Sequence, residues 1–296
     1  MNLLYCGDVN TRKGIALSLL SVADKVREPL HVWLMTMSLD LSDVGTRHQK
    51  YGLEKTFDPE GAAAKAGNVA PIDKSFAEYM QQVLQASNPA STVTLVDATP
   101  LYESEVPVAN VNTRFTPCCM LRLYADMVSP ELPDRILYLD YDVLCRCDCT
   151  DYYYQDMEGY EYAATLDYYG KWFYSPLRHN YINSGVLLMN LSYMRRTGLL
   201  RSCRQLCRDR ELFLPDQHAL NRCRSSWKKM PARYNSQRRL LPDTVFHHFS
   251  TVLHFFPPRF ESIKPWNVQK VHDILGIYEY DGLLDRLSSI IKELNL

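Results

Sequence analysis

Along this chain, short apolar runs alternate with longer amphipathic stretches. Strand-like runs occur at residues 2–6, 30–35, 92–97, 135–140 and 185–191, and helical periodicity occurs at 14–26, 39–51, 73–86 and 117–127. Residues 54–70 are rich in Gly and Ala without a clear period, and we expect a loop there. Because strands joined through helices pair in parallel, the alternation predicts an α/β chain whose mostly parallel central sheet is covered by helices on both faces.

The length and composition further restrict the class of protein. With 296 residues, 46% of them hydrophobic, the chain can form one large or two small domains. Its formal net charge of −1 argues against a nucleic-acid-binding protein. No apolar window reaches the roughly 18 residues of a membrane span, and no signal-peptide pattern follows Met1, so we expect a cytoplasmic protein.

The nine cysteines are odd in number and irregularly spaced, which indicates reduced thiols rather than a disulfide framework. Three of them, Cys145, Cys147 and Cys149, alternate along one short segment. That segment lacks the two-residue gap of a structural zinc knuckle, which argues against a zinc site there.

Two carboxylates stand at the end of a strand-like run, in Tyr138-Leu139-Asp140-Tyr141-Asp142-Val143-Leu144. In an extended backbone Asp140 and Asp142 point to the same side and repel one another unless a cation lies between them. Mg²⁺ and Mn²⁺ accept carboxylate and phosphate oxygens together. Asp-x-Asp is common by chance, but apolar neighbours on both sides favour a metal site over a solvated turn.

Three histidines could supply a third metal ligand. His247, His248 and His254 lie in apolar surroundings, where a histidine with a backbone partner is the commoner arrangement. They are followed by Lys264-Pro265-Trp266, which places a lysine on a proline-stiffened turn where it could reach a phosphate.

Several motifs, taken in order, resemble those of glycosyltransferase family 8. They are Asp8 and Asn10 after the first strand, Arg122 in a predicted helix, the segment 138–144, Asn183-Ser184-Gly185 before an apolar run, Pro215-Asp216-Gln217, His254 and Lys264-Pro265-Trp266. The resemblance covers residues 1–267 except a variable segment near 54–72. It implies a GT-A catalytic domain at 1–267, followed by a small helical extension at 268–296.

The family transfers a sugar from a nucleoside-diphosphate sugar, with Mn²⁺ and with retention of configuration at the anomeric carbon. The resemblance therefore implies UDP-glucose or UDP-galactose as donor, a saccharide or glycan as acceptor, and Mn²⁺ as cofactor with Mg²⁺ as the alternative. By position, the metal ligands are Asp140, Asp142 and His254, the donor-binding residues are Asp8, Asn10, Arg122, Asp140, Asn183, Gly185 and Lys264, and the catalytic residues are Asp167, Asp216 and Gln217.

The resemblance also implies that Gln217 occupies the position under the β-face of the anomeric carbon. An amide is a poor nucleophile, so we favour attack by the acceptor on the face that UDP leaves, over a covalent intermediate on Asp167 or Asp216. The metal and Lys264 would stabilise charge on the departing diphosphate.

One stretch departs from the family pattern. Nine residues without a glycine, 255–263, separate His254 from Lys264. Arg259 could therefore share the role of Lys264, and His247 or His248 could replace His254 as a ligand.

Two further segments are compatible with more than one kind of binding partner. Residues 195–240 carry thirteen Lys and Arg against three Asp and Glu, about +10, which fits a solvated helix face or contact with an anionic acceptor, a phospholipid surface or another protein. The C-terminal helix has an apolar stripe but no basic face, so packing on the catalytic domain or a homodimer contact is favoured over peripheral attachment to the inner membrane face. The alternative functions are a catalytically idle nucleotide-sugar-binding protein and a sugar nucleotidyltransferase.

Overall fold

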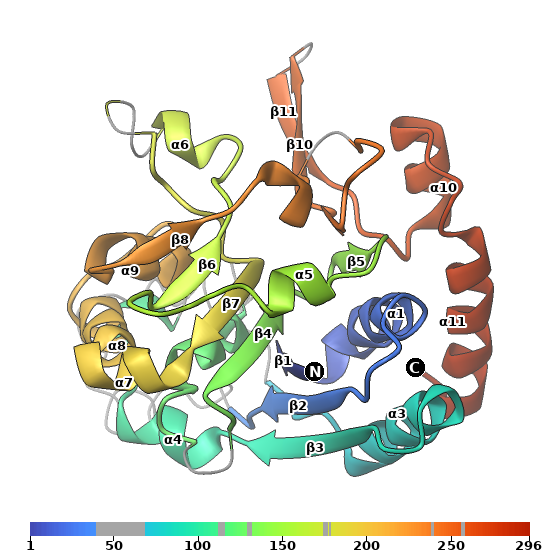
Figure 1. The fold of residues 1–296 in the computed structure, drawn as a ribbon, viewed down its shortest axis with the longest axis horizontal. Helices are drawn as coiled ribbons and strands as arrows, with labels where there is room; N and C mark the ends of the chain where they lie inside the picture. The colour runs from blue at the N-terminus through green and yellow to red at the C-terminus, as the bar shows by residue number, and fades with distance from the viewer. Residues whose placement is uncertain are drawn as a thin grey trace, which may run out of the picture.

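The fold is described from a computed structural model (Figure 1). It describes residues 1–39, 69–111, 116–128, 132–173, 177, 179–237, 240–255 and 258–296, with the backbone alone at 172–173 and 251–262. The expected helix at 39–51 and most of the loop at 54–70 lie outside the described residues.

A seven-stranded sheet forms the centre of the molecule, in the order β3-β2-β1-β4-β7-β6-β8 (Figure 1). Its strands are β1 (Asn2–Cys6), β2 (His31–Thr36), β3 (Thr92–Asp97), β4 (Arg135–Leu139), β6 (Tyr162–Ala164), β7 (Val186–Asn190) and β8 (Trp227–Lys229). Four of the six pairings are parallel, and β7 runs antiparallel to both β4 and β6. The mostly parallel α/β sheet predicted from the sequence is confirmed.

Helices cover both faces of this sheet. The α-helices are α1 (Arg12–Ala23), α3 (Lys74–Ser87), α4 (Thr99–Ser104), α5 (Thr150–Tyr153), α6 (Gly170–Phe173), α7 (Leu191–Thr197), α8 (Leu199–Asp209), α9 (Pro215–Cys223), α10 (Val268–Lys270) and α11 (Asp281–Leu294). The 3₁₀ helices are η1 (Val9–Thr11), η2 (Val108–Asn110), η3 (Pro117–Tyr124) and η4 (Ala232–Tyr234), and η5 (Val271–Leu275) is a π-helix. The helix expected at 117–127 is present as the 3₁₀ helix η3, which ends earlier than the pattern suggested.

Alternate residues of β1 show how the two cores are divided. Leu3 and Tyr5 point into a core shared with α1, α3 and α11, whereas Leu4 and Cys6 point into a core shared with η3, α7, α8 and α9. Successive side chains of a strand face opposite sides of a sheet, so a run that is buried throughout requires cover on both sides.

The C-terminal helix α11 lies against α1 (Figure 1). Its Leu284, Leu287 and Ile290 are buried in the same core as Leu17 and Leu20 of α1. The apolar stripe therefore packs on the rest of the chain, as favoured from the sequence. None of the described helices is long and apolar enough to cross a membrane.

Two small β-ladders lie outside the main sheet. β5 (Val143–Cys145) pairs antiparallel with β9 (Phe246–His248), and β10 (Thr251–Phe255) pairs antiparallel with β11 (Pro258–Ser262). The β10–β11 hairpin projects from the body of the molecule (Figure 1) and accounts for the long stretch before Lys264.

Candidate active site

Two aspartates and a histidine meet where β4 gives way to β5. The Asp140 N–H donates to the Gly185 carbonyl at 2.8 Å, and the Val143 N–H donates to the Asp140 carbonyl at 3.1 Å, which turns the chain between the two strands. The β5–β9 pairing sets Val143 opposite His248 and so brings that histidine beside Asp142. One ligand atom each from Asp140, Asp142 and His248 lies within 4.8 Å of the others.

The distances inside this cluster suit a divalent cation. His248 Nε2 lies 3.4 Å from Asp142 Oδ1 and 3.9 Å from Asp140 Oδ2. Two carboxylates and one imidazole nitrogen form a donor set that accepts Mn²⁺ or Mg²⁺ and leaves positions for phosphate oxygens. Of the His, Cys, Asp and Glu side chains in the described ranges, this is the one group of three or more with such geometry, and the cysteines at 145, 147 and 149 are free thiols outside it.

Lys264 supplies positive charge at the same place. Its Nζ lies 2.5 Å from Asp142 Oδ2 and 5.6 Å from the centre of the Tyr141 ring. Burial alone would raise the pKa of the Asp142 carboxyl, but the charges of Lys264 and His248 outweigh it and hold that pKa below its usual value. The carboxylate therefore stays ionised and available as a ligand.

The turn that carries Lys264 is anchored by aromatic packing. Trp266 lies 5.8 Å from Tyr141, ring centre to ring centre. Both rings pack against Gly14 of α1, where an added Cβ would lie 2.7 Å from each ring. A side chain at position 14 would push this turn away from Asp142.

Gly185 allows His248 and Asp140 to approach the backbone of the loop before β7. A Cβ at this position would lie 2.3 Å from His248 Cε1 and 2.9 Å from Asp140 Oδ2, closer than such contacts occur. A larger residue at position 185 would displace two members of the cluster.

Asn235 is a site residue that the sequence did not reveal. It is 1% exposed, its Nδ2 donates to Asn183 Oδ1 at 2.8 Å, and its Oδ1 lies 3.1 Å from His248 Nδ1. An amide oxygen only accepts, so this contact places a proton on Nδ1, and Nε2, which faces the two aspartates, is the nitrogen that a metal would take. No motif includes Asn235, because its partners are distant in the sequence.

Arg122 connects the aspartate cluster with the residues predicted to hold the sugar. This arginine is buried, and its guanidinium donates to Asp140 Oδ1 at 2.8 Å and to the Ser184 carbonyl at 2.8 Å. It also lies 3.4 Å from Asp216 Oδ2 and 4.0 Å above the Tyr138 ring. Burial would lower the Arg122 pKa, but the carboxylates around it raise that pKa well above its usual value, so the charge is retained.

Four of the predicted sugar-site residues form one hydrogen-bonded network with Ser184. Gln217 Oε1 accepts from the Ser184 N–H at 3.0 Å, while Gln217 Nε2 donates to Asp167 Oδ2 at 3.2 Å. Asn183 Nδ2 donates to the same Asp167 oxygen at 2.9 Å, and Ser184 Oγ donates to Asp216 Oδ2 at 2.9 Å. Asp167, Asn183, Asp216 and Gln217 are thus brought together.

Asp8 and Asn10 follow β1, which is parallel to β4, so they lie at the same edge of the sheet as Asp140. Asp8 is buried and accepts from the Asn10 N–H at 2.9 Å, while the Asn10 side chain is exposed. Carboxyl ends of parallel strands are the usual ligand edge of an α/β sheet.

The three histidines differ in their surroundings. His248 joins the aspartates, whereas its neighbour His247 points to the opposite side, 4.0 Å from the Phe249 ring and 3.2 Å from the Tyr280 hydroxyl. The side chains of His254 and Arg259 lie outside the described residues, so their expected roles stay predictions. His248 is the alternative that the sequence had left open.

The comparisons with known proteins agree on one family. A family model described as Glycosyl transferase family 8 matches residues 68–270. The curated "Probable glycosyl transferase Gly" of Streptococcus gordonii is 26% identical over 170 residues, covering 54% of this chain and 23% of the relative. The chain thus spans less than a quarter of that relative's length.

Solved structures share the fold at low identity. The galactosyltransferase LgtC, crystallised with donor and acceptor sugar analogs, superposes with a TM-score of 0.61 at 17% identity, covering 98% of this chain and 96% of its own. The glycosyltransferase GlyE of Streptococcus pneumoniae TIGR4 gives a TM-score of 0.60 at 15% identity, with 96% and 63% covered. The GT-A fold expected from the resemblance is confirmed.

Proposed function

Because the chain belongs to glycosyltransferase family 8, we propose that it transfers a hexose, glucose or galactose, from a UDP-sugar to a saccharide or glycan acceptor with retention of configuration. The observation that carries this proposal is the contact of Arg122 with both Asp140 and Asp216. It joins a cation-binding cluster to a group of sugar-binding side chains within one buried site. A catalytically idle nucleotide-sugar-binding protein would not need to retain Asp140, Asp142, Asp216 and Gln217 together.

Mn²⁺, with Mg²⁺ as the alternative, is the cofactor we propose, and Asp140, Asp142 and His248 are the residues that would hold it. When bound, it would supply Lewis-acid stabilisation of the diphosphate charge. His254 remains the alternative third ligand from the family resemblance. Lys264 lies close enough to Asp142 to contact a diphosphate held in the same place.

The chemistry follows from where charge develops. The bond between the anomeric carbon and the UDP oxygen breaks, a bond to the acceptor oxygen forms, and the acceptor's proton passes to the leaving phosphate. Negative charge grows beside Lys264, and positive charge grows on the sugar ring beside Asp167 and Asp216. Preorganised charges of opposite sign on both sides lower the barrier to this separation.

The Gln217 side-chain oxygen can still face the sugar ring with a free lone pair. Ser184 Oγ has one proton and lies closer to Asp216, at 2.9 Å, than to Gln217 Oε1, at 3.3 Å, so the hydroxyl contact with the amide oxygen is the weaker of the two. The Ser184 N–H is the main donor to the Gln217 amide oxygen, which retains acceptor capacity toward the anomeric carbon. We accordingly favour same-face attack over a covalent intermediate on Asp167 or Asp216.

The first test is thermal unfolding with UDP alone, Mn²⁺ alone, both together, and both after chelation. A ligand at about 100 times its dissociation constant stabilises by about 2.7 kcal/mol, so a rise that needs both components supports the proposed site. Incubation with UDP-glucose or UDP-galactose and an acceptor panel should then release UDP. No response to any nucleotide would reject the transferase, and pyrophosphate release from a nucleoside triphosphate plus a sugar phosphate would favour a nucleotidyltransferase.

We also propose that residues 1–267 form the catalytic unit and that 268–296 extend it. Since α11 buries Leu284 and Leu287 against the core of α1, the extension contributes to stability. A chain truncated after residue 267 should unfold at a lower urea concentration than the full chain. Equal midpoints would show that the extension is energetically independent.

A further inference from the structure

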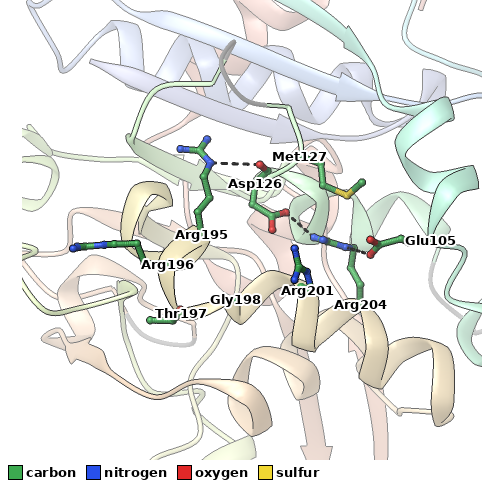
Figure 2. Close-up of a pocket in the computed structure, with 9 residues that line it drawn as sticks. All are labelled: Glu105, Asp126, Met127, Arg195, Arg196, Thr197, Gly198, Arg201 and Arg204. Carbon is green, nitrogen blue, oxygen red and sulfur yellow. Dashed lines mark hydrogen bonds and ion pairs between the residues drawn. The ribbon is translucent and has the colours of Figure 1, made fainter.

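A pocket rich in arginine lies at the opposite edge of the sheet from the Asp140 cluster. β7 is antiparallel to β4, so its last residue, Asn190, pairs with Arg135 at the start of β4, and α7 begins there. The pocket has a volume of about 490 Å³ and is lined by Glu105, Asp126, Met127, Arg195, Arg196, Thr197, Gly198, Arg201 and Arg204 (Figure 2). Its four arginines outnumber its two carboxylates, which leaves a formal charge of +2.

Arg204 forms the floor and has a structural role. It is buried, with Nε 2.5 Å from Glu105 Oε2 and Nη1 2.6 Å from Asp126 Oδ1 (Figure 2). Nη1 also donates to the Leu123 carbonyl at 2.5 Å. Because Arg204 pairs with both carboxylates, their charge is shielded from the rest of the pocket.

The other three arginines have unused donors. Arg195 binds Asp134 Oδ1 through Nη1 at 2.9 Å, but its Nη2 is buried without a hydrogen-bond partner. Arg196 and Arg201 are exposed, and in the described part of the chain neither has a carboxylate within ion-pair distance. A buried N–H without an acceptor costs roughly 1–3 kcal/mol, which an anion in the pocket would recover.

The backbone around Gly198 contributes partial charges of both signs, because α7 ends and α8 begins at this residue. α8 begins directly after Gly198. This glycine has a φ of 70° and no side chain that could cap the N–H groups of the first turn. Gly198 and Thr197 line the same pocket as the arginines. The N–H groups at the start of this eleven-residue helix favour negative charge, whereas the carbonyl groups at the end of α7 oppose it, so the arginines supply the positive potential of the pocket.

We propose that this pocket binds a phosphate group, separately from the candidate active site. The planar guanidinium groups of Arg195 and Arg201 offer paired donors that match phosphate oxygens. The Arg196 guanidinium lies 4.9 Å above the Tyr193 ring and points away from these two (Figure 2), so it adds positive charge at the rim of the pocket. Met127 provides an apolar wall for the part of the ligand that carries the phosphate. The phosphate could belong to a small phosphomonoester or to an anionic lipid headgroup, since both present the same oxygens.

The test uses the full chain and the double variant Arg196→Gln/Arg201→Gln, which leaves the Asp134-paired Arg195 in place. The matched control is Arg208→Gln/Arg222→Gln, which removes the same charge from exposed positions on α8 and α9. Binding of inorganic phosphate and glycerol phosphate is followed by calorimetry at constant ionic strength with the metal chelated. Binding to phosphatidylglycerol vesicles, with phosphatidylcholine as reference, is followed by flotation.

We expect the pocket variant to lose at least tenfold in affinity for one of these probes, while the control stays within about twofold of the unmodified protein. Loss for glycerol phosphate identifies a soluble ligand, and loss for vesicles alone identifies a lipid headgroup. Equal losses in both double variants would show a nonspecific charge effect and overturn the proposal. Absence of binding to every probe would overturn it as well, and neither outcome depends on glycosyl transfer.

Discussion

Replacing Asn235 tests whether the cation site depends on residues behind its ligands. Asn235→Ala removes the acceptor for His248 Nδ1 and the donor to Asn183 Oδ1, at 3.1 and 2.8 Å. The imidazole is then free to rotate or to place its proton on Nε2, where it could not bind a metal. Loss of a hydrogen-bond partner behind a metal ligand typically lowers metal affinity by about 10- to 100-fold.

The same change also destabilises the protein. Two buried hydrogen bonds at roughly 1 kcal/mol each, together with a buried His248 N–H left unpaired, suggest a loss of about 2–4 kcal/mol in the free energy of unfolding. Asn110→Ala is a matched control, because Asn110 is 0% exposed and bonds the Cys207 and Arg210 carbonyls and the Leu212 N–H. It should lose comparable stability with no change in metal affinity.

Mn²⁺ affinity can be measured in saturating UDP from the electron paramagnetic resonance signal of free Mn²⁺, without turnover. Asn235→Asp retains an oxygen for His248 Nδ1, so it should bind Mn²⁺ more tightly than Asn235→Ala. If Asn235→Ala is as destabilised as Asn110→Ala yet binds Mn²⁺ like the unmodified protein, the positioning role is refuted.

Four further substitutions test the remaining parts of the site. Gly185→Ala should displace His248, lowering the free energy of unfolding by about 1–3 kcal/mol in urea titrations and weakening Mn²⁺ binding; unchanged values would mean that the loop relaxes freely. Asp142→Asn should abolish Mn²⁺-dependent turnover with an unchanged circular dichroism spectrum, and full activity would remove it from the metal site. Gln217→Ala should lower kcat more than donor affinity, whereas an unchanged kcat would exclude it from catalysis. Lys264→Met should weaken UDP binding about tenfold by calorimetry, and equal affinity would show that the lysine serves only Asp142.

Local patterns were sufficient for much of the framework. The run 92–97 is strand β3 as predicted, and the helix expected at 73–86 is α3 at Lys74–Ser87, with Asp73 as its N-cap. Periodicity and capping depend on neighbours within a few residues, so they can be found without knowing the fold. The position of Asp140 and Asp142 at a strand end could be predicted for the same reason.

The positions of His247 and His248 required the tertiary structure. Three histidines looked equivalent in the sequence, and the family resemblance favoured His254. The β5–β9 register brings His248 to Asp142, and strand alternation turns His247 away toward Tyr280. A register between segments about one hundred residues apart depends on the packing of the whole sheet, which no local pattern encodes.

The same limit applies to Asn235 and to the antiparallel direction of β7. Each depends on which segments become neighbours after the chain has crossed the sheet several times. The residues proposed to hold the substrate could be named from the sequence because their types and order resemble the motifs of the family. The residues that position them, such as Asn235 behind His248, were decided by three-dimensional packing alone, since a buried polar group is defined by the partner it meets.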